Sequence, residues 1–162
     1  MSAADLDTLG RRGVDGYVHH YCRHPVERTT WMPGVVELLD DLRDVAVGVC
    51  TNKPRAPTEA VLAGMGLADR VRVLVAGGDL PQKKPDPAPL RVMMARAEAV
   101  AEATLMIGDG PQDVGCANAA GVRSLAVCGG FASREALEAA GPTWLVDSMH
   151  EARPIVRALR GL

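Results

Sequence analysis

Two aspartates four residues apart, Asp109 and Asp113, form the most informative chemical pattern in the sequence. They follow the apolar run 104–107, where a strand is expected to pass into a helix, so one carboxylate leaves the strand end and the other faces it from the first helical turn. Two carboxylates placed in this way suit Mg²⁺, which combines few protein carboxylates with water and phosphate oxygens. The alternative is structural: Asp109 caps the helix and Asp113 interacts favourably with its dipole.

A lysine and a hydroxyl residue are the other candidates for chemistry. Lys84 stands before Pro85 in a turn, where its ammonium group could neutralise a phosphoryl group, although an isolated lysine is more often a solvated surface residue. Thr51 ends the apolar run 45–50, and its hydroxyl could donate to a phosphoryl oxygen or cap the next turn. Along the chain these groups occur in the order hydroxyl, lysine and carboxylate pair. This order is more informative about function than any one of the three alone.

The elements that must position these residues alternate between helix and strand from Pro33 onward. The apolar patterns predict strands at 45–50, 71–75, 104–107, 124–127 and 144–146, and helices over 35–43, 57–65, after Asp86-Pro87, 111–120, 133–141 and from Ser148. This alternation predicts an α/β fold with three layers and a Rossmann-like parallel sheet. Ligands of such sheets bind beyond the carboxyl ends of the strands. Pro154 is expected to break the start of the last helix.

Composition excludes several classes of function. The 162 residues carry a net charge of −2 and only 3% aromatic residues, so no nucleic-acid partner is expected. No apolar run reaches the roughly 18 residues that span a bilayer and no signal peptide is visible, so we expect no membrane partner and a cytoplasmic location. The four cysteines form no C-x-x-C pair and are expected to be free thiols.

Three motifs in this order resemble those of haloacid dehalogenase (HAD)-like phosphatases, and of the phosphoglycolate phosphatase branch in particular. Val49-Cys50-Thr51-Asn52-Lys53-Pro54 looks like the second motif of that family, and Lys84-Pro85-Asp86-Pro87 is similar to the third. The stretch from Ile107-Gly108-Asp109-Gly110 to Asp113 resembles the fourth. The resemblance runs from about Tyr17 to the end of the chain and implies a HAD-like core.

The resemblance also implies roles for individual residues. Thr51 and Lys84 would be catalytic, and together with Asn52 they would bind the phosphate of the substrate. Asp109 would bind Mg²⁺, while Asp113 would support both the metal and Lys84. The implied activity is Mg²⁺-dependent hydrolysis of a small phosphorylated metabolite such as 2-phosphoglycolate. The alternative is a non-catalytic remnant, or a regulatory or binding module, that keeps the phosphate and Mg²⁺ loops.

The first motif of the family, Asp-x-Asp-x-Thr after a strand, has no convincing match. Its first aspartate would be the nucleophile. Asp5-Leu6-Asp7-Thr8 is superficially similar, but its threonine comes one place early and no apolar strand precedes it. We therefore expect no nucleophile in this chain, and no activity from the chain as written.

The expected domain organisation follows from the resemblance. Residues 1–30 are expected to be a remnant of a helical cap with its linker, and residues 31–162 a core truncated at its N-terminal side, without its first, nucleophile-bearing strand. That strand would lie between the one ending at Thr51 and the one ending at Gly108. The sequence thus predicts direct pairing of these two strands, filling of the position by another chain through self-association, or aggregation through the open edges.

The cluster of His19, His20, Cys22 and His24 is expected to be an exposed helix end rather than a metal site.

Overall fold

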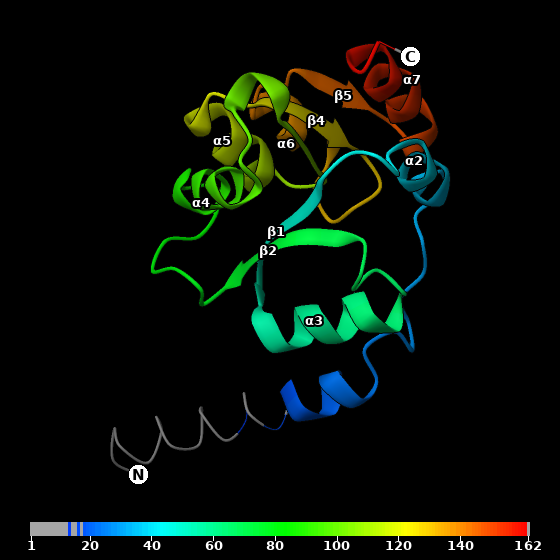
Figure 1. The fold of residues 1–162 in the computed structure, drawn as a ribbon, viewed down its shortest axis with the longest axis vertical. Helices are drawn as coiled ribbons and strands as arrows, with labels where there is room; N and C mark the ends of the chain where they lie inside the picture. Colours follow the sequence, from blue (N-terminus) through cyan, green and yellow to red (C-terminus); the bar gives the residue numbers. More distant parts are fainter. Residues whose placement is uncertain (1–12, 14–15, 17, 162) are drawn as a thin grey trace.

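The structure, a computed structural model, describes residues 13, 16 and 18–161 and alternates strands with helices from Val35 onward (Figure 1). The predicted elements are present, with small shifts in their bounds. They are α2 (Val35–Asp41), β1 (Val47–Pro54), α3 (Arg55–Gly64), β2 (Val71–Gly77), α4 (Ala88–Ala97), the 3₁₀ turn η1 (Ala101–Ala103), β3 (Leu105–Gly108), α5 (Pro111–Ala120), β4 (Arg123–Val127), α6 (Arg134–Ala139), β5 (Trp144–Val146) and α7 (Met149–Leu159).

The strands form two parallel sheets instead of the single sheet that the sequence pattern predicts. In the first sheet β1 pairs with β2, and in the second the order is β3-β4-β5. Among the described residues no backbone hydrogen bond joins β1 to β3. Direct pairing of these two strands, one of the three outcomes that the sequence predicts, is therefore not found, and the other two stay predictions.

The three predicted layers are visible in the alternating side chains of β4. Leu125 and Val127 pack with residues of α2 and α7 on one face, whereas Ala126 packs with residues of α5 and α6 on the other. A third apolar cluster joins α4 and α5 to β3 through the buried residues Leu90, Met106 and Cys116. A strand that is apolar on both faces is thus covered on both faces, as in parallel α/β sheets generally.

The last helix, α7, differs from the expectation. Pro154 lies inside a continuous helix that begins at Met149, and it does not break the helix start. Proline removes only one backbone donor, and here the helix is fixed by tertiary contacts: Ala152 and Val156 lie in the core, and Arg153 pairs with Asp41 of α2 at 2.5 Å. Ser148 caps the helix as predicted, its hydroxyl accepting from the N–H of Glu151.

The segment before α2 packs against the first sheet. Residues 18–23 are helical and lie beside α3 in Figure 1. The Nζ of Lys53, in β1, donates to the Tyr21 hydroxyl at 2.6 Å and lies 4.4 Å from the centre of the Tyr21 ring. His19, His20 and His24 are exposed as predicted. The Asp5-Leu6-Asp7-Thr8 stretch lies outside the described residues, and the proposed domain boundary near residue 30 stays a prediction.

No helix in the described part of the chain combines the length and apolarity needed to cross a lipid bilayer.

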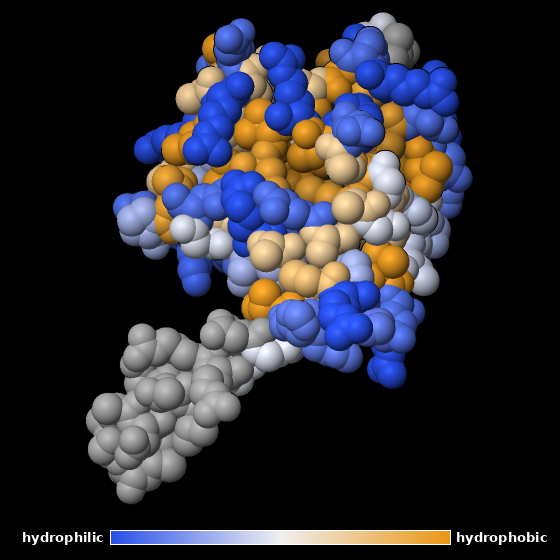
Figure 2. All heavy atoms as spheres, turned by 60° about the horizontal axis from the view of Figure 1, so that its bottom comes forward, coloured by the Kyte–Doolittle hydropathy of each residue, from blue (hydrophilic) through white to orange (hydrophobic). Residues whose placement is uncertain are grey.

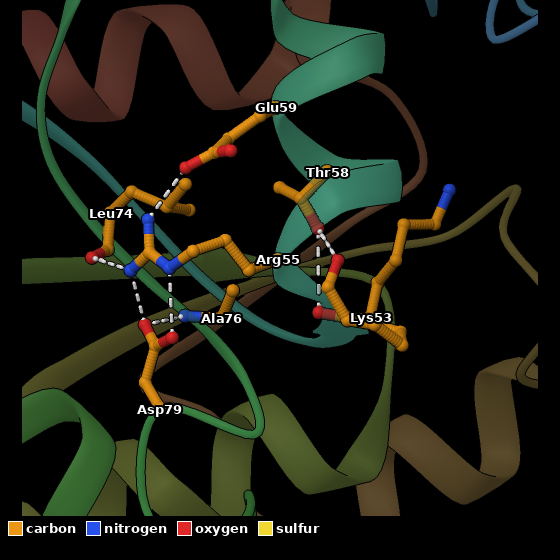
Figure 3. Close-up of polar contacts among 8 residues, drawn as sticks. Lys53, Arg55, Thr58, Glu59, Leu74, Ala76 and Asp79 are labelled. Atoms are coloured by element: carbon orange, nitrogen blue, oxygen red, sulfur yellow. Dashed lines mark hydrogen bonds and ion pairs between the residues drawn. The ribbon is translucent and has the colours of Figure 1, made fainter. Parts of the chain in front are cut away.

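An ion-pair cluster ties the start of α3 to the loop after β2 (Figure 3). The guanidinium group of Arg55 donates to both carboxylate oxygens of Asp79 and to Oε1 of Glu59 at 2.8 Å. The other contact of Asp79 is the backbone N–H of Ala76, which donates to its Oδ2 at 2.9 Å. The hydrogen bond from Arg55 and the one from Ala76 hold the pKa of Asp79 below its ordinary value of 3.8.

We predict that Asp79→Asn lowers the free energy of unfolding at pH 7 by about 1 kcal/mol, because a charged hydrogen bond to a partly exposed arginine is lost. A carboxylate with a lowered pKa stabilises the fold fully above its unfolded pKa, near 4, and that stability is lost as the pH falls through the folded pKa. The difference between wild type and variant should therefore shrink below about pH 4. Urea titrations between pH 7 and pH 3 measure this difference in the free energy of unfolding. Asp147→Asn, at an exposed ion pair, is the control, and a difference that stays constant with pH would contradict the prediction.

Candidate active site

Lys84 lies at the centre of the candidate site and not on the surface. Its Nζ donates to the backbone oxygen of Cys50 at 2.6 Å and to Oδ1 of Asp113 at 2.5 Å. The side chains of Lys84 and Asp113 are only 9% and 7% exposed. Cys50 lies in the middle of β1, while Asp113 lies in the first turn of α5, so one ammonium group connects the two sheets of the molecule.

Asp113 has two structural contacts, one on each carboxylate oxygen. Oδ1 accepts from Lys84, and Oδ2 accepts from the backbone N–H of Gly110 at 3.1 Å, which completes the N-terminal cap of α5. A Cβ atom at Gly108 would overlap this carboxylate, so the end of β3 needs glycine for steric reasons. The capping role that the sequence left open thus belongs to Asp113, and Asp109 does not cap the helix.

Asp109 is the carboxylate of the site that remains available. It is exposed, and it has no hydrogen-bond or ion-pair partner within the part of the chain that the structure describes. The backbone of Gly130, in the loop after β4, lies directly against its carboxylate. Asp109 therefore presents hard oxygen ligands to solvent one residue away from Gly110, which Asp113 contacts.

The arrangement fits Mg²⁺ only in part. The described residues contain no group of three or more His, Cys, Asp or Glu side chains that could hold a metal ion. Mg²⁺ is commonly held by one or two carboxylates while water and phosphate oxygens complete its shell. Asp109 suits that role, whereas both oxygens of Asp113 are already engaged. Each oxygen of Asp113 accepts one hydrogen bond and keeps a second lone pair, so the assignment of Asp109 and Asp113 as metal ligands stays a prediction.

Asn52 and Thr51 lie at the carboxyl end of β1, beside Lys84. The side-chain amide of Asn52 donates to the backbone oxygen of Lys84 at 3.0 Å and accepts from its backbone N–H at the same distance. Thr51 Oγ1 accepts from the N–H of Lys53 at 3.1 Å, which leaves its own proton free to be donated. The contacts of Asn52 are those of a positioning residue, and the predicted role in substrate binding stays a prediction.

Two features of the site were not anticipated from the sequence. Cys50 packs with Cys116 beneath Lys84, and the hydrogen bond to Cys116, followed by burial, raises the pKa of the Cys50 thiol, so it is no candidate for a thiolate nucleophile. Phe131, fully exposed in the loop after β4, borders a cavity of about 270 Å³ together with Asp109 and Gln112. The rule that ligands bind beyond strand ends could have pointed to this fourth loop.

Comparison with known proteins identifies the class to which this fold and site belong. The family profile of haloacid dehalogenase-like hydrolases matches residues 9–127, and the chain belongs to that family. It is similar to a phosphoglycolate phosphatase from Rhodospirillum rubrum, with 40% identity over 143 residues, which are 87% of this chain and 59% of the relative. The chain thus spans little more than half the length of that relative.

Solved structures show the same fold. A predicted phosphoglycolate phosphatase from Haemophilus somnus superposes with a TM-score of 0.83 at 22% identity, over 96% of this chain and 68% of its own. CbbY from Rhodobacter sphaeroides, solved in complex with phosphate, superposes with a TM-score of 0.75 at 22% identity, over 83% of this chain and 61% of its own. At this level of identity the likeness supports the fold only.

We predict that Lys84→Met destabilises the protein by about 3–5 kcal/mol, because the carboxylate of Asp113 then stays buried without its partner. The double variant Lys84→Met/Asp113→Asn should recover at least half of this loss, since no unpaired charge remains. Urea unfolding of the wild type, both single variants and the double variant measures the coupling. Additive losses would show that the two side chains do not form a buried pair.

Proposed function

We propose that this chain forms the phosphate-binding part of a HAD-type phosphatase that hydrolyses a small phosphomonoester. The observation that carries this proposal is the position of Lys84, which connects β1 to the start of α5 through Cys50 and Asp113, beside Thr51 and Asn52. Such a position concentrates a fixed positive charge where the ends of parallel strands meet, which is where ligands of α/β sheets bind. A phosphoryl group is the ligand for which that charge is suited.

Each residue of the site has a distinct role in this proposal. The hydroxyl of Thr51 and the ammonium of Lys84 would donate to phosphoryl oxygens, while Asn52 fixes the backbone of Lys84. Asp109 would hold Mg²⁺, which when bound supplies positive charge to the phosphoryl oxygens. Asp113 would keep Lys84 charged and oriented. Similarity to the R. rubrum enzyme favours 2-phosphoglycolate as the substrate.

A second candidate is a binding module that keeps the phosphate and Mg²⁺ loops without catalysis. Within the described residues, Asp113 is the only carboxylate that pairs with Lys84, and no residue there takes the place of the attacking aspartate that the family resemblance implies. Phosphate binding without turnover would favour this candidate, whereas turnover would exclude it.

We predict weak binding of Mg²⁺ and phosphate by the 162-residue chain, with a Kd of about 1 mM or above, because among the described residues of the site only Asp109 presents a carboxylate without another contact. Asp109→Asn should abolish the dependence of phosphate binding on Mg²⁺. Asp44→Asn, which changes an exposed aspartate paired with Arg160, is the matched control. Isothermal titration calorimetry with inorganic phosphate, with and without Mg²⁺, measures both. Equal loss in the two variants would contradict the assignment of Asp109.

We predict that the same chain hydrolyses p-nitrophenyl phosphate and 2-phosphoglycolate at the background rate. Loss of a covalent nucleophile costs several orders of magnitude in rate even where positioning survives. A Mg²⁺-dependent turnover number of about 1 per second, which is within the usual range of enzymes, would contradict the predicted lack of activity. Asp5→Asn and Asp7→Asn would then show whether the Asp5-Leu6-Asp7-Thr8 stretch supplies the nucleophile.

A further inference from the structure

Cys50 and Cys116 meet side chain to side chain in the apolar cluster beneath Lys84. Cys50 belongs to β1, and Cys116 belongs to α5, the helix that packs on β3 and β4. The contact between the two thiols therefore bridges the two sheets, as the Lys84–Asp113 pair does. The function proposed above assigns no role to either thiol.

The two thiols lie on the elements that hold the candidate site. The backbone oxygen of Cys50 accepts from Nζ of Lys84 at 2.6 Å. Asp113, the carboxylate partner of Lys84, lies nearly one helical turn before Cys116 in α5, so both side chains are on the same face of that helix. A change in the distance between the two sulfurs thus acts on both anchors of Lys84.

The two sulfurs share their protons unequally. The hydrogen bond from the Cys50 thiol lowers the pKa of Cys116, and the same hydrogen bond raises the pKa of Cys50. The positive charge of Lys84 favours ionisation of both thiols, in opposition to burial. Cys116 is therefore the sulfur that carries negative charge, with the Cys50 thiol as its hydrogen-bond donor. A thiolate beside a second thiol is the arrangement of a dithiol redox site.

Cys50 gives the pair a route to solvent. It is half-buried and lines an apolar cavity of about 790 Å³ between the two sheets, whereas Cys116 is fully buried. Figure 2 shows apolar side chains gathered on one hollowed face of the molecule, bordered by charged ones. Susceptibility to oxidation follows exposure as well as thiolate character, so a small uncharged oxidant suits this pair better than a bulky one.

Packing alone does not require two thiols in contact. A free cysteine behaves as a small apolar residue, and Met93 and Met94 fill space in the same cluster. Thiols that already form a hydrogen bond need only a small movement to form a covalent bond. We propose that Cys50 and Cys116 form a reversible disulfide when the protein meets a hydroperoxide, and that this bond locks β1 to α5 beneath Lys84.

The oxidation proceeds in two steps. The thiolate of Cys116 attacks one oxygen of hydrogen peroxide, the O–O bond breaks, and the departing hydroxide takes up the proton that Cys116 had released, which leaves a sulfenic acid and one water. The sulfur of Cys50 then attacks the sulfur of Cys116, the S–O bond breaks, and the Cys50 proton leaves with the hydroxide as a second water. Because Cys116 is fully buried, the reaction should take minutes to hours rather than seconds.

Peptide mapping tests the proposal with the wild-type 162-residue chain. Trypsin leaves the four cysteines in four different peptides, with Cys50 in residues 44–55 and Cys116 in residues 97–123. After treatment with millimolar hydrogen peroxide and alkylation of the remaining thiols, these two peptides should be joined in most molecules, and dithiothreitol should release them. A larger amount of any other joined pair, or oxygen added to Cys50 and Cys116 without a bond between them, would overturn the proposal.

Unfolded protein is the control for chance pairing. The same treatment in concentrated urea should give a mixture of joined peptides, because the fold no longer holds the two thiols together. The same mixture from the folded chain would show that the structure does not select this pair, and the proposal would be wrong.

The disulfide should also change thermal unfolding. It closes a long loop of the unfolded chain, so oxidation should raise the apparent Tm by about 5–10 °C, and dithiothreitol should reverse the shift. The background Cys22→Ser/Cys128→Ser keeps the pair as its only cysteines. Adding Cys116→Ala to this background is the matched control and should remove the shift. A shift of the same size in the control would assign the effect to another oxidation, such as that of methionine, and would contradict the proposal.

Discussion

The contact of Lys84 with Cys50 and Asp113 is the interaction on which the candidate site depends. It is the described polar contact that joins β1 to the start of α5, and it lies almost entirely out of solvent. A buried pair of this kind contributes little net stability, because desolvation offsets much of the Coulomb attraction. Its effect is geometric: it fixes the distance between the strand that holds Thr51 and the loop that holds Asp109.

Several local features are arranged around this pair. Asn52 fixes the backbone of Lys84 with two hydrogen bonds, and Gly108 leaves room for the carboxylate of Asp113. The N–H of Gly110 uses the second oxygen of that carboxylate. The side chains of Asn52 and Asp113 thus hold Lys84 in place, and Asp109 is exposed and without a partner among the described residues.

The sequence predicted the elements well because their signals are local. The apolar run before Thr51, the proline and aspartate at the start of α5 and Gly121 at its end all act within a few residues. It also predicted that Thr51, Lys84, Asp109 and Asp113 belong to one edge, since parallel strands bring their carboxyl ends together. The sequence could not predict which oxygen of Asp113 each donor uses, the packing of Cys50 against Cys116, or the continuity of α7 through Pro154. These features depend on tertiary packing.

The division into two sheets has a consequence for cooperativity. In the described part of the chain the β1–β2 unit and the β3–β5 unit have separate backbone hydrogen-bond networks, so side-chain contacts, namely the packing of α4 and the Lys84–Asp113 pair, couple them. Thr51 belongs to the first unit, and Asp109 and Asp113 belong to the second. A ligand held between them would couple the two units, and its binding energy would appear as a more concerted unfolding transition rather than as a local change in order.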